Sequence, residues 1–378
     1  MLQSEILPPP ATQALISLSA FRHNMSVVRA YIGPIPRIMA VVKANAYGHG
    51  AEKMAHEAMQ GGATFLGVAR VHEGVELRRA GVDAPILVFE VPLSDQIGTA
   101  LHHRLALTVS SDEGAARVSE MGVRLGVRGP VHVKIDTGMS RLGFPHGEAE
   151  QHITRIVSLP GLTLEGVYSH FATSDEEDTG YALTQLERFN GVIARLESLG
   201  LHIPLKHMAN SGAIISMPQA HFDLVRPGIM LYGYAPRPGM PQRFPLQQVM
   251  NLSSRVVLIK PVSRGTSVSY SRRYTTQEDT RIATVPIGYA DGYSRLLTNR
   301  ATALIKGRRY PVVGTICMDQ LMIDVGGESD VREGDEVVLM GRSGEEVIDA
   351  DDIARTIGTI NYEVTCLVTR RVPRTYVE

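Results

Sequence analysis

The first two-thirds of the chain repeats a short apolar run, a turn and an amphipathic stretch with helical spacing. Residues 181–200 form one such stretch, in which apolar side chains recur every three or four positions. Parallel strands need a long crossover between them, so this alternation predicts βα units. Eight runs favour a closed (β/α)8 TIM barrel over an open sheet. They span residues 37–43, 64–69, 84–91, 105–109, 131–136, 162–170, 203–208 and 221–226.

The pattern changes after about residue 245, where short β-branched segments alternate with glycines. Residues 253–271 and 301–326 are typical of strands joined by tight turns, which predicts a mainly antiparallel β-domain. Near its end, residues 349–368 suggest one helix followed by a closing strand. The Pro- and Gly-rich segment 235–245 is the natural linker. The sequence therefore predicts a barrel at 12–244 and a C-terminal β-domain at 245–378.

Charges are nearly balanced over the 378 residues, with a formal net charge of −1. Basic residues are not massed into runs, so neither nucleic acid nor an acidic membrane is expected as a partner. No apolar run approaches the ~20 residues needed to cross a bilayer, and residues 1–18 make a poor secretion signal. Two cysteines are too few for a disulfide framework. We therefore expect a cytoplasmic protein.

Polar residues follow several of the apolar runs at the point where each strand should end. In a (β/α)8 barrel, the active site lies at the C-terminal ends of the strands. Each residue alone could be an ordinary solvated strand terminus, but their clustering indicates a catalytic site. No metal site is predicted, because the pair His102–His103 has no further ligands at a suitable spacing. The candidates are Lys43, Lys134, Asp136, His170, Asn210, Ser211 and Arg226.

Lys43 allows two interpretations from its position alone. A lysine that is partly desolvated and close to other cations is a good nucleophile towards a carbonyl group. A structural lysine paired with a carboxylate such as Asp136 is an equally good explanation. The loops at 209–213 and 224–233 follow the last two runs, where barrels often bind phosphate. Ordinary turn chemistry could also explain these two loops.

The stretch "AVVKANAYGHG" at residues 40–50 resembles the cofactor-lysine motif of the alanine racemase family. Members of this family use pyridoxal 5′-phosphate (PLP) on an eight-stranded barrel followed by a β-domain. Further motifs occur in the family's order along nearly the whole chain, so the chain is identified as a member of this family. They include "KIDTGMSRLGF", "HMANSGA", "VRPGIMLYG", "VSYSRRY" and "GTICMDQLMIDV".

The resemblance implies roles for individual residues. Lys43 would bind PLP covalently and act as one of two acid/base groups. Tyr270, lent by the partner subunit of a homodimer with shared active sites, would be the other. Arg226 would face the pyridine nitrogen, and His170 would lie beside the ring. The implied cofactor-binding set is Lys43, Tyr47, His170, Asn210, Ser211, Arg226, Gly228 and Ile229.

The resemblance also implies how the amino-acid substrate is held. Arg141 and the backbone of Met318 would bind its carboxylate. Lys134 matches a lysine that is carbamylated in some members of the family and orients that arginine. Arg370 departs from the family, which usually has a tyrosine at this position beside the phosphate and the substrate entrance. This departure leaves the selectivity for alanine open.

The expected activity is the interconversion of L-alanine and D-alanine by a Lys/Tyr two-base mechanism, which would supply D-alanine for peptidoglycan. One alternative is a broader amino-acid racemase that also accepts serine. Another is a barrel-type PLP decarboxylase, although the segment 268–274 matches the racemases. A non-catalytic PLP carrier would be a single barrel, and the β-domain with Tyr270 argues against it.

Overall fold

A computed structural model describes residues 10–237, 240 and 244–378. The chain divides into two compact units. The first, which we call the barrel unit, comprises residues 21–247. The second, the β unit, combines the residues up to 20 with residues 248–378. Residues 238, 239 and 241–243 of the expected linker lie outside the described residues.

Parallel strands in the order β10-β2-β3-β4-β5-β6-β8-β9 build the barrel unit, as predicted. Asp223 donates a backbone hydrogen bond to Lys206, and Arg226 donates one to Ala209, so the ring nearly closes between β9 and β10. Each strand overlaps one of the eight apolar runs. The strands are β2 (Arg37–Val41), β3 (Phe65–Val68), β4 (Ile86–Val88), β5 (Ala106–Val109), β6 (Gly129–Asp136), β8 (Leu162–Tyr168), β9 (Leu205–His207) and β10 (Leu224–Val225).

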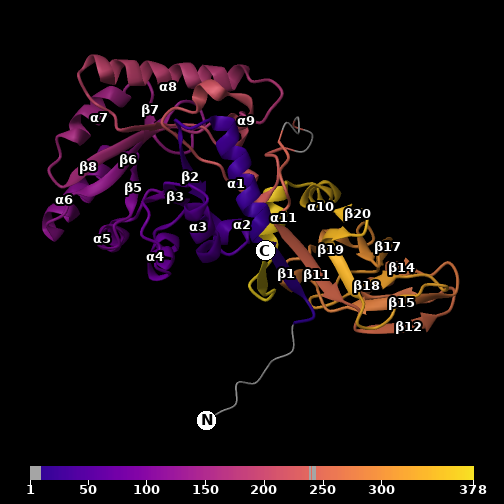
Figure 1. Ribbon diagram of the computed structural model, residues 1–378. Coiled ribbons are helices and arrows are strands. Elements are labelled where there is room, and N and C mark those ends of the chain that lie inside the picture. The colour runs from indigo at the N-terminus through magenta and orange to yellow at the C-terminus, as the bar shows by residue number, and fades with distance from the viewer. Residues whose placement is uncertain (1–9, 238–239, 241–243) are drawn as a thin grey trace, which may run out of the picture. The chain divides into compact units, whose positions relative to one another are not determined.

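Helices surround these strands, and Figure 1 shows α4 to α7 on the outside of the sheet. Strands that are covered on both faces bury most of their residues, which explains why their sequences are nearly continuous apolar runs. The short β7 (Phe144–Pro145) pairs with β6. The helices are α1 (Leu18–Ile32), α2 (Lys43–Tyr47), α3 (Ala51–Gln60), α4 (Val71–Arg79), α5 (Ser94–His102), α6 (Asp112–Leu125), α7 (Ala149–Val157), α8 (Gly180–Ser198) and α9 (Ser211–Ser216).

The core of the barrel is a cluster of apolar side chains contributed by different strands. Its members lie on the inner faces of six strands, and Phe89 packs against them. Such a filled interior makes the barrel a rigid support for groups at its rim. The cluster consists of Met39, Phe65, Leu87, Ala106, Leu205 and Leu224.

The β unit contains a sheet in which neighbours are antiparallel, apart from one pair, as predicted. That exception is β1 (Gln13–Ser17), which pairs in parallel with β21 (Arg374–Val377) and antiparallel with β11 (Met250–Arg255). The expected boundary placed residues 12–20 with the barrel, whereas β1 lies inside this sheet. The other strands are β12 (Leu258–Val262), β15 (Thr280–Val285), β16 (Thr302–Ile305), β17 (Arg308–Val313), β18 (Leu321–Asp324), β19 (Glu336–Ser343) and β20 (Glu346–Ile348).

The prediction of one helix and a strand for residues 349–368 was wrong. Two helices occupy this segment, α10 (Ala350–Ile357) and α11 (Asn361–Leu367). Gly358 ends α10 because it adopts a φ of +78°, where its N–H donates to Ala354 at 2.8 Å. The closing strand is β21, further along the chain. Among the described residues, no helix is both long and apolar enough to span a bilayer.

Candidate active site

Lys43 lies two residues after the end of β2, where the chain forms a single left-handed helical turn. The next four residues all have a φ between 52° and 54°, although none of them is glycine. A left-handed turn costs about 1–2 kcal/mol per L-residue because Cβ approaches a carbonyl oxygen. Backbone strain of this kind gathers at functional sites, where the surrounding structure holds it in place. The residues concerned are Ala44, Asn45, Ala46 and Tyr47.

The end of this turn is held by its own residues and by the barrel wall. Asn45 accepts from the backbone N–H of Gly50 through its carbonyl, at 2.9 Å, and from that of Ala51 through its side chain, at 2.8 Å. The Tyr47 ring packs 4.9 Å from the ring of Tyr232, centroid to centroid. Tyr232 itself donates to the carbonyl of Val41 at 2.9 Å, which ties both rings to β2.

Tyr47, Ser211 and Gly228 meet beyond the ends of β2, β9 and β10. The Ser211 Oγ accepts a hydrogen bond from Gly228 N at 2.9 Å. A Cβ added to Gly228 would lie only 2.4 Å from the Tyr47 hydroxyl, so glycine is required for this close approach. Two hydroxyls therefore converge on a glycine backbone, beside Ile229. Such a cradle of small polar groups is suited to a phosphate.

Asn210 closes the loop that carries Ser211. Its side-chain oxygen accepts from Ala213 N at 2.9 Å and so caps α9. The same oxygen accepts a hydrogen bond from the Ser174 hydroxyl at 2.9 Å. Asn210 thus positions Ser211 through the helix that follows.

Arg226 lies after β10 with its guanidinium buried under four hydrogen bonds. Nη2 donates to the carbonyls of Ser169 at 2.9 Å and Met208 at 3.0 Å. The remaining two bonds go to ring nitrogens, to His207 Nδ1 from Nη1 at 2.9 Å and to His170 Nδ1 from Nη2 at 3.0 Å. Burial lowers the pKa of Arg226 to about 10, which still leaves it protonated at neutral pH.

The contact with Arg226 fixes the protonation of His170. A guanidinium can only donate, so Nδ1 of His170 must accept and its proton must lie on Nε2. Burial, with the charges of Arg226 and Lys134, lowers the pKa of His170 well below 6.5. The charge of Lys43 acts in the same direction. His170 is therefore a neutral ring whose Nε2–H is available as a donor.

Two buried histidines that the sequence analysis missed extend this network. His207 accepts from Arg226 and must donate from Nε2 to His132 Nδ1, at 2.8 Å. His132 Nε2 then faces the Glu165 carboxylate at 3.6 Å. The pKa of His207 is also well below 6.5, chiefly because of burial and the charge of Arg226. The sequence did contain a signal for these two residues, because a histidine interrupts the apolar run of β6 and of β9.

Lys134 lies inside the barrel with little exposure. Its Nζ lies 4.5 Å from the centre of the Tyr168 ring. Burial, followed by the charges of Arg226 and Arg141, lowers the pKa of Lys134 well below 10.5. Asp136 Oδ1 accepts from Gly138 N at 2.9 Å and Ser140 N at 3.0 Å. These bonds shape the loop that presents the exposed Arg141.

The remaining predicted residues, Tyr270 and Met318, belong to the β unit. Tyr270 begins a short turn after β13 (Ser267–Val268), and its side chain is 70% exposed. Thr315 Oγ1 donates to the carbonyl of Tyr270 at 2.8 Å. Met318, also exposed, accepts a backbone hydrogen bond from Ala290 at 3.1 Å. Hydrogen bonds thus hold the backbone at both residues, while their side chains remain exposed.

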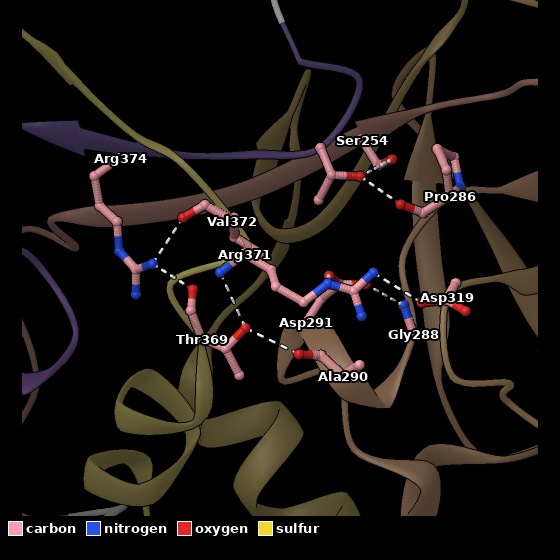
Figure 2. A network of polar contacts seen from close by, with 11 residues as sticks. Ser254, Pro286, Gly288, Ala290, Asp291, Asp319, Thr369, Arg371, Val372 and Arg374 are labelled. Carbon is pink, nitrogen blue, oxygen red and sulfur yellow. Dashed lines mark hydrogen bonds and ion pairs between the residues drawn. The ribbon is translucent and has the colours of Figure 1, made fainter.

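Figure 2 shows a polar network around Asp291 and Asp319, the residue that follows Met318. Arg371 binds Asp319 at 2.8 Å and Asp291 at 3.3 Å. Asp291 also accepts from Gly288 N at 2.9 Å. Arg370, the residue that departs from the expected tyrosine, is exposed next to Arg371. Arg371 therefore connects the loop at 288–291 to the loop at 317–319.

Comparison with known proteins identifies the family of this chain. The family model for the alanine racemase N-terminal domain matches residues 16–236, and that for the C-terminal domain matches residues 249–376. The chain belongs to the alanine racemase family. The alanine racemase of Desulforamulus reducens is 47% identical over 366 residues, which are 96% of this chain and 98% of that relative.

Solved structures of the family are similar over almost the whole chain. The alanine racemase of Clostridium difficile 630 has a TM-score of 0.94 and 39% identity, covering 98% of this chain and 97% of its own. That of Bartonella henselae, determined with covalently bound pyridoxal phosphate, has a TM-score of 0.87 and 28% identity. It covers 98% of this chain and all of its own. The barrel followed by an antiparallel domain is therefore the family fold.

Proposed function

We propose that this protein is a PLP-dependent isomerase that interconverts L-alanine and D-alanine. The observation that carries the proposal is the arrangement at the barrel rim in a chain of this family. A lysine follows β2, a hydroxyl-lined cradle lies beside it, and a buried arginine remains protonated. A structural lysine would not require the other two features.

The residues at the rim fit PLP. Its phosphate would be held by Tyr47, Ser211, Gly228 and the backbone of Ile229. The absence of a side chain at Gly228 leaves room for it, since a Cβ there would fill the cradle. Asn210 would contribute by fixing the Ser211 loop. His170 would lie beside the ring, and Lys43 would be the covalent attachment. The B. henselae relative carries its pyridoxal phosphate covalently.

Arg226 would face the ring nitrogen of PLP and tune its chemistry. Because a guanidinium only donates, that nitrogen would remain unprotonated. Bound PLP would then withdraw electrons from the substrate Cα more weakly than with an acidic partner, which disfavours side reactions such as transamination. His170 and His207 hold Arg226 in this orientation from two sides.

Racemisation needs one acid/base group on each face of the substrate Cα. Lys43 would remove or return the proton on one face. Tyr270 would do so on the other, provided by the β unit of a second copy of the chain. The proposed assembly is therefore a homodimer with shared active sites. The 70% exposure of the Tyr270 side chain supports this, because a partner could cover it.

Arg141 and the backbone of Met318 would hold the substrate carboxylate. Lys134 would support Arg141 after carbamylation, since only a neutral amine reacts with carbon dioxide. The lowered pKa of Lys134 favours that neutral amine, and its carbamate would place a negative charge near Arg226 and Arg141. A buried neutral amine would thus become an anion near two arginines.

The proposed role is the supply of D-alanine for peptidoglycan, in the cytoplasm. A second candidate is a broader racemase that also accepts serine. The observation that favours it is Arg370, an exposed side chain where the family usually has a tyrosine. An arginine at this position could still bind the phosphate of PLP. Replacing the tyrosine would therefore alter the substrate entrance more than the cofactor site.

Incubation with L-alanine in deuterated water tests the proposal. The wild type should produce D-alanine labelled at Cα, because the returned proton comes from exchangeable groups. Lys43→Ala should produce none, and Tyr270→Phe should lower turnover by about 10²-fold or more, as expected for loss of an acid/base group. Unlabelled or absent D-alanine in the wild type would contradict the proposal. The same experiment with L-serine tests the second candidate.

A further inference from the structure

Glu73, in the first turn of α4, joins two loops of the barrel unit through one carboxylate. Oε1 accepts from Ala44 N at 2.7 Å. Oε2 accepts from Ala69 N at 2.7 Å and from Arg70 N at 3.0 Å. The first loop contains Lys43, and the second follows β3. A single side chain therefore bonds the backbone after β2 to the backbone after the neighbouring strand.

The bond to Ala44 acts on the peptide group that links it to Lys43. The sheet ladder ends two residues before Ala44, where Val42 N donates to Gly67 O at 2.9 Å. Ala44 is also the first residue of the left-handed turn, with a φ of 52°. Glu73 thus holds the chain where the sheet no longer supports it and where the backbone is strained.

The chemistry of the contact requires a carboxylate. An ionised carboxylate has two acceptor oxygens and no donor, so it can satisfy all three N–H groups. A glutamine has one acceptor oxygen, and its NH2 group would face N–H groups that it cannot bond. Hydrogen bonds to a charged acceptor are also shorter and stronger than neutral ones. Oε1 and Oε2 are both used here.

α4 gives Glu73 a fixed base. Val71, Val75 and Leu77 on the same helix are buried, so its position is set by the barrel packing. Glu76, one turn further on, is exposed. The carboxylate of Glu73 is bonded to the rim loops, whereas Glu76 lies on the exposed face of the same helix.

We propose that Glu73 is a positioning residue for Lys43. It fixes the position of the Lys43–Ala44 peptide, so that the lysine side chain extends from a fixed backbone towards the PLP site. This inference rests on the proposed function, because it assigns Lys43 to cofactor attachment and proton transfer. In this role Glu73 acts through the backbone of the Lys43 loop and not by contact with substrate or cofactor.

Glu73→Gln in the PLP-loaded enzyme tests the inference, with Glu76→Gln on the same helix as the matched control. Glu73→Gln should lower kcat for alanine by about tenfold or more, because small misplacements of a reacting group have such effects. KM should change little, since the substrate carboxylate is bound by other residues. PLP should dissociate faster, and backbone amides at 43–51 should exchange hydrogen faster. The control should match the wild type in all four measurements.

Glu73→Asp provides a second variant in case the first folds poorly. It keeps the charge but withdraws the carboxylate by one methylene, so it should show the same changes to a smaller extent. The inference would be overturned if both Glu73 variants matched Glu76→Gln in kcat, PLP release and exchange, or if they lost thermal stability alone. A wild type without racemase activity would instead contradict the proposed function, and the exchange data would still test the bond to Ala44.

Discussion

Arg226 is a buried charge whose four hydrogen-bond acceptors are all neutral. Two are carbonyl oxygens, and two are ring nitrogens of His170 and His207. Its charge, together with burial, keeps both histidines uncharged, because a second buried cation nearby would be unfavourable. Burial and the charge of Arg226 also lower the pKa of Lys134 well below its usual range. The barrel rim is therefore prepared for anionic ligands, which would supply the missing negative charge.

The neutral histidines predict a pH dependence of stability. In the unfolded chain, His170 and His207 bind a proton below a pKa of about 6.5, whereas the folded-state values are far lower. The unfolded state thus binds more protons, and the free energy of unfolding should fall as pH drops below 6.5. Above 6.5 neither state is protonated at these sites, so their contribution is constant. Each histidine should contribute about 1.4 kcal/mol per pH unit.

Urea unfolding between pH 7 and pH 5 measures this slope. His207→Gln removes one of the two titrating rings, while its side-chain oxygen can still accept from Arg226. The variant should lose up to about 1.4 kcal/mol per pH unit of the wild-type slope. An unchanged slope would show that His207 is not held neutral in the folded protein.

At the scale of elements, α2 differs most from its neighbours. Four L-residues adopt the left-handed conformation in sequence, between β2 and α3. Their sequence, Ala-Asn-Ala-Tyr, contains only one residue with a tendency towards positive φ, namely Asn45. The turn is therefore imposed by its surroundings, and glycine should suit it better than alanine.

Ala44→Gly should raise the free energy of unfolding by about 0.5–1 kcal/mol, because glycine avoids most of the left-handed penalty. Ala44→Val should lower it by about 1–2 kcal/mol, since a β-branched residue fits this conformation poorly. The matched control is Ala194→Gly on the exposed face of α8, which should cost about 1 kcal/mol. Equal losses for both glycine variants in urea unfolding would contradict the assignment of a left-handed turn.

The strands of the barrel could be predicted from sequence, whereas α2 could not. Continuous apolar runs reflect burial on both faces, and this local signal placed all eight strands. The left-handed turn leaves no such signal in its residues. The role of His207 also depends on contacts with residues from other strands. For β1, a single run of five residues cannot indicate which strands it will pair with. The candidate residues could be named from sequence because active sites of this fold lie at the C-terminal ends of the strands, and those ends were predicted. Their catalytic roles are still predictions.

At the scale of the whole molecule, the proposed catalytic groups lie in different units. Lys43 belongs to the barrel unit and Tyr270 to the β unit. If each active site combines the barrel of one copy with the β unit of another, the isolated chain is incomplete. Neither unit alone would then racemise alanine.

Mixing two inactive variants tests this arrangement. Lys43→Ala and Tyr270→Phe should complement each other after subunit exchange, because a hybrid dimer contains one intact site. Equal mixing should restore about one quarter of wild-type activity, since half of the dimers would be hybrids. Separate refolding of each variant without mixing is the control. No recovery in a mixture shown to contain hybrids would mean that both groups come from the same chain.

The position of β1 has a consequence for protein synthesis. β1 is translated long before one of its partners, β21. At about 5–20 residues per second, the interval between them is roughly 20–70 s. The barrel can form during that time, whereas the sheet is complete only after β21 has left the ribosome. Until then, the edge of β1 that pairs with β21 has no partner strand, so a chaperone that shields nascent chains should increase the yield of correctly assembled protein.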